Sequence, residues 1–429
     1  MDTENNPHIK LALMGSDAWN RWVRTVMSDE ELDALRVDDD RKNSLKLIEP
    51  LSDEEKNNLA SVLSLVDFDD LNCDINFSDL TVECDFTGVI FPGNADFTGV
   101  TFSNIVDFEG AIFSGDTGFQ NATFSGITSF QNATFSGITG FQNATFSGYV
   151  AFKGVTFSNI VDFEGAIFSR YADFEGATFS GVAAFEWAMF CDSSVFRSVT
   201  FSGDALFRGV KFGGSFNEFE EPSFINAEFY DRIDFTEAVF STPPLFHNVD
   251  LHQDTTFYQA KYLTIGRYDH RDQDMRAWRT LKIAMNKTHH HEQELMYFSF
   301  EMDAKRVSLI NEKKWMSWLV ISCYKWFSGY GQSLIKPFIA IAVAWVLFAV
   351  VYSLWMEGGL LSFITIIKGH QFSLSNLLPF VPTSKAVMDD VFKGDISLVL
   401  QILTVFQNIF STVMLFLIGL ALRHRFIIK

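Results

Sequence analysis

Phenylalanine returns along this chain first after five residues and then after six, from Phe86 to Phe257. The pattern is an internal repeat of eleven residues. Two successive copies are FSGITSFQNAT at 124–134 and FSGITGFQNAT at 135–145. A short period over so long a span is typical of a solenoid, because each unit buries its apolar side only against its neighbours.

Small residues stand two positions before every second phenylalanine, as Ala122 does before Phe124 and Ala133 before Phe135. Side chains alternate with period two in a strand, so both members of such a pair point the same way. Helical repeats need roughly 20 to 34 residues, whereas five or six residues cover one strand and a turn. The pattern predicts a β-helix whose interior stacks phenylalanine rings beside columns of alanine and valine.

The phrases NATF, GVTF and GAIF resemble the pentapeptide-repeat family, and the resemblance covers most of residues 67–260. It implies a right-handed β solenoid with four five-residue faces per square coil. A sixth residue in alternate units lengthens the expected coil to roughly 22 residues. The period slips between Phe212 and Phe224, where we expect a bulge or kink.

The chain divides into four predicted domains. Residues 1–66 form an α-helical cap, because an open β-helix end exposes strand edges that must be covered; a sensor or partner module is the alternative. The β-helix occupies 67–262. A helical connector with an interfacial amphipathic helix occupies 263–332, and a membrane domain with two spans and an intervening loop occupies 333–429.

Two stretches lack charged side chains and are long enough to cross a bilayer. Residues 337–356 are twenty residues without a charged side chain, and at about 1.5 Å per residue a helix of this length crosses the hydrocarbon core. Residues 396–422 form a longer stretch that would span with tilt. We therefore predict two transmembrane helices.

Aromatic and basic residues flank these spans, as is typical of a membrane interface. Basic residues before the first span and after the second place both chain ends in the cytoplasm. The membrane-interface candidates are Trp315, Trp318, Trp326, Lys325, Lys336, Arg423 and Arg425.

The second span carries polar residues on one face. At 100° per residue they fall within an arc of roughly 140°, and polar side chains in lipid face protein or water. The pore-lining candidates are Gln401, Thr404, Gln407, Asn408, Ser411 and Thr412. The same face continues with three gate candidates, Leu415, Gly419 and Leu422.

Between the spans, residues 373–378 could form a half-helix that enters the membrane and returns, because irregular backbone is tolerated where it lines a cavity. The re-entrant candidates are Ser373, Ser375, Asn376 and Pro379. This layout resembles two-transmembrane pore-loop channels, although the potassium filter TVGYG is absent. The alternative is a plain helical hairpin whose polar stripe holds an oligomer together.

Charge and composition exclude several functions. Residues 67–260 contain 27 Asp and Glu against 6 Lys and Arg, which disfavours direct nucleic-acid binding. Four cysteines without paired spacing suit a reducing compartment, and the start of the chain lacks a signal-peptide pattern. His289, His290 and His291 are adjacent and point in three directions, so a turn is favoured over a metal site.

No catalytic constellation is present, so an enzyme is not expected, and neither is a cofactor or metal. The segments FSLSNLLPFVP, YGQSLIKPF and FLIGLALRHRFIIK look like the C-terminal membrane module of some bacterial pentapeptide-repeat proteins. That resemblance implies a bacterial inner-membrane homo-oligomer with a cytosolic solenoid and an ion-channel-like end. The alternative is a membrane-tethered scaffold whose acidic solenoid binds a protein; a DNA-mimicking rod is a minor hypothesis.

Overall fold

The structure is a computed structural model that describes two compact parts of the chain. One comprises residues 1–267 with 276–290, and the other comprises 268–275 with 291–429. Within them, the described residues are 11–12, 14–33, 46–57, 75–76, 81–82, 85–213, 222–263, 271–356, 363–377 and 397–427. We call these parts the solenoid unit and the helical unit.

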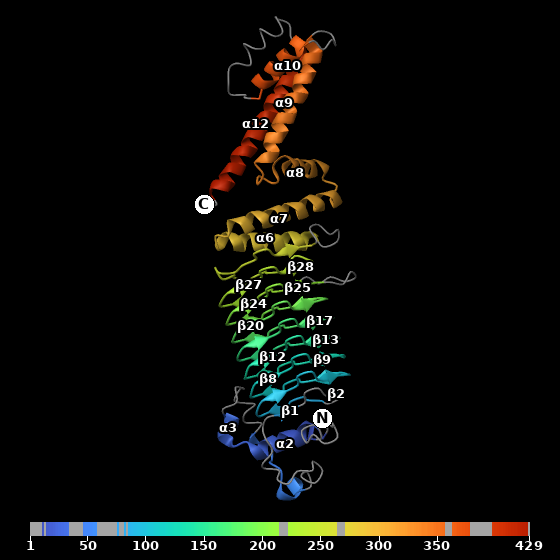
Figure 1. The fold of residues 1–429 in the computed structure, drawn as a ribbon, viewed down its shortest axis with the longest axis vertical. Helices are drawn as coiled ribbons and strands as arrows, with labels where there is room; N and C mark the ends of the chain where they lie inside the picture. Colours follow the sequence, from blue (N-terminus) through green and yellow to red (C-terminus); the bar gives the residue numbers. More distant parts are fainter. Residues whose placement is uncertain are drawn as a thin grey trace. The chain divides into compact units, whose positions relative to one another are not determined.

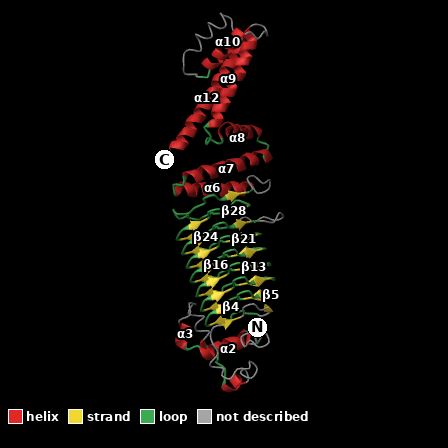
Figure 2. Ribbon diagram, in the orientation of Figure 1, coloured by secondary structure: helices red, strands yellow, loops and turns green. Residues whose placement is uncertain are grey.

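The solenoid unit is a β-solenoid of two-residue strands in four parallel sheets (Figures 1 and 2). The first sheet contains β1 (Ile75–Asn76), β4 (Ala95–Asp96), β8 (Thr117–Gly118), β12 (Thr139–Gly140), β16 (Val161–Asp162), β20 (Ala183–Ala184), β24 (Ala205–Leu206) and β27 (Ile233–Asp234). The second contains β2 (Thr81–Val82), β5 (Thr101–Phe102), β9 (Thr123–Phe124), β13 (Thr145–Phe146), β17 (Ile167–Phe168), β21 (Met189–Phe190), β25 (Lys211–Phe212), β28 (Val239–Phe240) and β29 (Lys261–Tyr262). The third contains β6 (Val106–Asp107), β10 (Thr128–Ser129), β14 (Val150–Ala151), β18 (Ala172–Asp173) and β22 (Ser194–Val195). The fourth contains β3 (Ile90–Phe91), β7 (Ile112–Phe113), β11 (Thr134–Phe135), β15 (Thr156–Phe157), β19 (Thr178–Phe179), β23 (Thr200–Phe201) and β26 (Glu228–Phe229).

Strand register confirms the predicted coil length. Thr134 pairs with Thr156, so successive coils stand 22 residues apart in the sequence. The step is 20 residues at the start, where Ile75 pairs with Ala95. It grows to 28 where Thr200 pairs with Glu228, across the segment in which the period slips. The predicted bulge itself falls largely on 214–221, outside the described residues.

Phenylalanine rings fill the interior as the repeat predicts. Phe141 lies between Phe119 and Phe163, with ring centroids 4.8 Å apart on both sides and planes within 3° of parallel. Its nearest rings in the next column meet it edge to face, as Phe130 does at 5.6 Å. All these rings are fully buried. Aromatic contacts of this kind contribute about 0.5–1.5 kcal/mol each beyond their buried area.

The chain makes a tight turn directly after Phe130 and its equivalents in neighbouring repeats, and this turn explains the FQNA units. The amide of Ala133 donates to the carbonyl of Phe130, and Asn132 between them has a φ of 55°. Type II turns need positive φ at this position, which favours asparagine or glycine. Asn121 and Asn143 hold the same conformation one repeat away on either side.

Replacing Asn132 by alanine is therefore expected to lower the solenoid's free energy of unfolding by about 1 kcal/mol, because alanine tolerates the left-handed region poorly. Denaturant unfolding followed by circular dichroism measures the change. Asn132→Gly is the matched control and should shift the value by less than about 0.5 kcal/mol. Equal losses for the two variants would show that the side chain, and not φ, sets the cost.

The first coils are covered by α2 (Ser16–Val26), which is followed by α3 (Asp29–Asp33). Asn20 acts as a substitute strand, because its amide donates to Gly88 O at 3.0 Å and its oxygen accepts from Ile90 N at 3.1 Å. Trp19 is fully buried, donates to Ile90 O and lies 5.4 Å from the ring of Phe91. Asn20 thus pairs with the open strand edge, and Trp19 covers the apolar end of the coil.

The other end is closed by the part of α6 (Arg271–Lys287) that belongs to the solenoid unit. Tyr262 continues the phenylalanine column, 5.4 Å from Phe240, and Trp278 of α6 meets Tyr262 edge-on at 5.0 Å. Leu281 and Met285 are buried on the same helix.

The helical unit contains α7 (His291–Asn311), α8 (Trp315–Ser328), α9 (Ile335–Met356), α10 (Phe363–Ser375) and α12 (Leu398–Ile427). The connector predicted over 263–332 is therefore divided between the two units. His289 and His290 form the turn between α6 and α7. Two helices are long and apolar enough to cross a membrane, over Ile335–Trp355 and Leu398–Phe426, with mean hydropathy of 2.3 and 2.0.

Helix α10 runs back along α9 (Figure 1). Gly369 lies against Ala349 and Ser353, and Ser373 Oγ donates to Trp345 O at 2.9 Å. Because Trp345 lies near the middle of α9, α10 returns about halfway along that helix and ends there. The half-helix predicted at 373–378 thus overlaps only the end of a helix that begins at Phe363.

Candidate functional site

A polar cluster lies buried where α9, α10 and α12 meet. Gln407 is fully buried; its oxygen accepts from the Tyr352 hydroxyl at 2.8 Å. Its amide nitrogen donates to Ser373 Oγ at 2.9 Å and to Ser373 O at 3.0 Å. These three residues, the inner cluster, join the three helices through groups that lipid could not satisfy.

Two further buried polar residues lie near the inner cluster. Ser411, one turn after Gln407, is fully buried, and its Oγ meets no hydrogen-bond partner among the described residues. Asn376 follows α10 directly and is also fully buried, beside the hydroxyl of Tyr352. Buried polar groups cost free energy unless they are hydrogen-bonded, so this part of the unit depends on close packing of the three helices.

The rest of the predicted stripe is divided between covered and open positions. Gln401 and Thr412 are exposed, and Thr404 and Asn408 are half-buried. Both threonines bond back to their own helix, Thr404 to Leu400 O and Thr412 to Asn408 O, each at 2.8 Å. Thr404 also approaches the Tyr352 hydroxyl, and the side-chain oxygen of Asn408 is buried. We call the two exposed residues, Gln401 and Thr412, the outer stripe. The predicted face is therefore split: Gln407 and Ser411 point into the chain, while the outer stripe does not.

The gate candidates continue the outer stripe. Gly419 is exposed, and a methyl group added to it would meet no atom within 4 Å. Leu422 is exposed and Leu415 is half-buried. Gly419 and Leu422 are therefore open in the single chain, whereas Leu415 is partly covered.

The re-entrant candidates lie at the end of α10. Ser373 belongs to the inner cluster, and Ser375 Oγ donates to Phe372 O at 2.8 Å. Asn376 occupies the turn that follows, and Pro379 lies outside the described residues.

Most of the membrane-interface candidates are solvent-exposed. Trp315 and Trp326 are 59% and 60% exposed, and Trp318 is half-buried. Exposed charges stand at Lys336, Arg423 and Arg425. Lys325 differs from these, because its Nζ donates to both carboxylate oxygens of Asp303, at 2.7 and 2.9 Å.

Asp303 forms a link that sequence patterns did not single out. Besides Lys325, it accepts from the Tyr330 hydroxyl at 2.7 Å, so α7 is tied to α8 and to the loop before α9. Tyr330 is 2% exposed and has a φ of 58°. Burial, together with the bond to Asp303, raises the pKa of Tyr330, which keeps the hydroxyl protonated as a donor. A buried non-glycine residue with positive φ is held by its surroundings.

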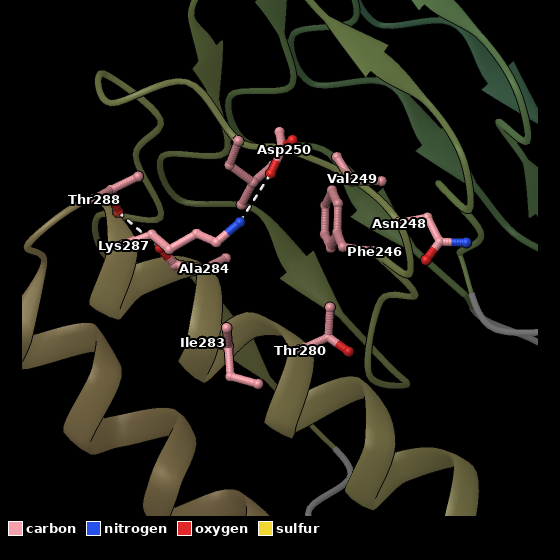
Figure 3. A pocket seen from close by; sticks show the side chains of 10 residues that line it. Phe246, Asn248, Val249, Asp250, Thr280, Ile283, Ala284, Lys287 and Thr288 are labelled. Carbon is pink, nitrogen blue, oxygen red and sulfur yellow. Dashed lines mark hydrogen bonds and ion pairs between the residues drawn. The ribbon is translucent and has the colours of Figure 1, made fainter.

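The solenoid unit also has a cavity, of about 460 Å³, where α6 meets the last coil (Figure 3). Lys287 Nζ lies 3.1 Å from Asp250 Oδ1 across it, and His247 contacts Thr280 at 3.1 Å beside it. Both charged groups are largely solvent-exposed, and such pairs contribute little. The residues lining this cavity single out no ligand.

The family model described as Pentapeptide repeats (9 copies) matches the chain over residues 66–123, 86–134, 97–144, 119–167 and 141–188. The matched part of the solenoid, residues 66–188, is thus built of pentapeptide repeats, and the described residues of the helical unit include two long apolar helices. Searches of curated proteins and of solved structures found no match.

Proposed function

We propose that this chain is a membrane-embedded homo-oligomer in which copies of α12 surround a passive, ion-conducting pore. The observation that carries the proposal is the split of the polar face on α12. Gln407 satisfies its bonding inside the chain, whereas Gln401 and Thr412 stay on the outer surface of an apolar helix and Asn408 is half-buried between the two sides. Polar side chains that face lipid are costly, so a neighbouring copy or water must cover them.

A pore explains the outer stripe better than close helix packing does. Small residues at closely spaced positions would let two helices approach, but Phe416 lies within this surface and is 68% exposed. Leu415 and Leu422 then provide an apolar ring near one end, where a constriction would gate by excluding water.

Orientation follows from the basic residues. Lys325 and Lys336 precede the first span, and Arg423 and Arg425 follow the second. In the proposed arrangement both flanks are cytoplasmic, and the acidic solenoid is a cytosolic assembly or sensor domain.

Single-channel recording of the full-length protein in a planar bilayer tests the pore. Asn408→Leu should reduce the conductance, because it removes a half-exposed amide from the proposed wall. Leu415→Asn should increase the fraction of time spent open, because a polar ring holds water. Ile402→Leu, on the outside of α12 about 100° from Gln401, is the matched control and should change neither value.

A second candidate, the membrane-tethered scaffold, is favoured by one feature of the solenoid. Ile105, Ile127, Tyr149 and Tyr171 stand in one column along a corner, with the tyrosine rings stacked 5.5 Å apart. Ile105 is 69% exposed. An apolar column on an acidic surface suits a protein partner. Correctly assembled protein that stays silent under voltage, tension and pH steps would favour this function over the pore.

A further inference from the structure

A cavity of about 480 Å³ opens in the helical unit between the start of α7, the loop before α9 and the end of α12. Its volume lies within the usual range for small-ligand sites, about 300–1,000 Å³. Glu292 of α7 and His424 and Arg425 of α12 line it, together with the apolar side chains of Leu295 and Leu334. The cavity therefore combines one carboxylate, one guanidinium, one imidazole and an apolar wall.

Hydrogen bonds fix the shape of this cavity. Gln332 Nε2 donates to Leu295 O at 2.6 Å, which holds the loop against α7. His424 Nδ1 lies 3.1 Å from Gly331 O, and because a carbonyl only accepts, the ring must donate there. The end of α12 is thus fastened to the same loop. Three separate elements are held around one space without filling it.

The two charged side chains of the cavity, Glu292 and Arg425, do not pair with each other in the described part of the chain, although both line the same space. Both side chains are solvent-exposed. A ligand that carries a cation and an anion a few bonds apart would meet both.

The cavity lies where both apolar stretches end. Residues 337–356 and 396–422 are uncharged. The lining residues at 332–335 and 424–425 fall immediately outside them, and Ala421 lies just inside the end of the second stretch. In a chain that spans a membrane, this is the level of the lipid headgroups. The position of the cavity at the headgroup level rests on the proposed function, whereas its lining does not.

We propose that this cavity binds the headgroup of a zwitterionic glycerophospholipid that carries a primary ammonium. The phosphate would lie against Arg425, and the ammonium against Glu292. Leu295 and Leu334 would contact the start of the acyl region. A primary ammonium donates hydrogen bonds to a carboxylate, whereas a trimethylammonium group has no N–H to donate and is bulkier. The site should therefore distinguish phosphatidylethanolamine from phosphatidylcholine.

Native mass spectrometry of the full-length protein in detergent, with defined mixtures of the two lipids and phosphatidylglycerol, measures the preference. The wild-type chain should retain phosphatidylethanolamine about tenfold more strongly than phosphatidylcholine. Glu292→Gln should abolish that difference. Arg425→Gln should lower retention of phosphatidylethanolamine and phosphatidylglycerol alike, by about tenfold. Arg423→Gln removes the same charge from a neighbouring residue that does not line the cavity, and should leave the preference intact.

Three results would overturn the assignment. They are equal retention of the two zwitterionic lipids by the wild-type chain, equal effects of Arg423→Gln and Arg425→Gln, and displacement of the lipid by soluble phosphoethanolamine at equal concentration. The last would identify a site for a free phosphate compound. The pore is judged separately: a silent bilayer with the lipid preference intact removes the pore and keeps the site. Failure of the protein to co-purify with any lipid removes the site, and the bilayer recording still decides the pore.

Discussion

Replacing Phe141 by alanine is expected to lower the free energy of unfolding of the solenoid by about 3–5 kcal/mol, the usual cost of emptying a buried aromatic site. Phe141 is fully buried between Phe119 and Phe163 and meets Phe130 edge to face. The cavity left behind cannot collapse easily, because the backbone on each side is fixed by parallel strand pairing in all four sheets.

The loss should also spread along the stack. In a solenoid each coil is stabilised mainly by its two neighbours, so a defect in the middle weakens two interfaces and uncouples the halves. Denaturant unfolding followed by circular dichroism should show a lower midpoint and a broader transition. Limited proteolysis should cut near residue 141 in the variant before it cuts the wild-type chain.

Ile138→Ala serves as the matched control, since Ile138 lies in the same repeat but is 47% exposed. It should cost less than about 1 kcal/mol. Comparable losses for the two variants would mean that the stacked rings are not the main source of stability.

The regularity of the repeat made most of the solenoid predictable. A phenylalanine every five or six residues fixes which side chains point inward, and adding the intervals fixes the coil at 22 residues, as the pairing of Thr134 with Thr156 confirms. Local chemistry also determines the corners, because asparagine and glycine recur where φ is positive. Trp187 is an exception that no pattern foretells: it has a φ of 59° and lies over Gly209 of the next coil.

The helical unit was less predictable, because one helix alone does not reveal which side its neighbours cover. Gln407 and Asn408 are adjacent and fall in the same polar arc. Yet Gln407 is fully buried against Tyr352 and Ser373, while Asn408 is only half-buried. Helical periodicity locates the arc, and only the position of α9 and α10 divides it.

Contacts between residues far apart in the sequence could not be predicted either. Asp303 and Tyr330 stand 27 residues apart, and nothing in their spacing indicates that the carboxylate accepts from the hydroxyl. Sequence patterns mark Lys325 as a basic residue of the membrane interface. The structure gives that lysine a specific partner, and the partner suggests a test.

Replacing Asp303 by alanine is expected to lower the free energy of unfolding of the helical unit by about 2 kcal/mol. Removing one partner of a buried ion pair costs about 3–5 kcal/mol, but the Lys325 side chain is 35% exposed and water would compensate part of the loss. Tyr330 would also lose its acceptor while remaining buried, which adds to the cost. Asp303→Asn should lower the free energy of unfolding by less than Asp303→Ala does, because its amide oxygen still accepts from Tyr330.

The measurement is thermal unfolding of the full-length protein in detergent, with proteolysis between α7 and α8 as a local readout. Glu312→Ala is the matched control in the turn directly after α7: Glu312 pairs with Lys314 at 2.6 Å, but both side chains are exposed, so its loss should change the unfolding temperature much less than Asp303→Ala does. If Asp303→Ala unfolds at the same temperature as Glu312→Ala, then Asp303 does not hold α7 to the helices that follow. A selective loss for Asp303→Ala, with faster cleavage after α7, would identify this carboxylate as the joint through which α7 is tied to α8 and α9.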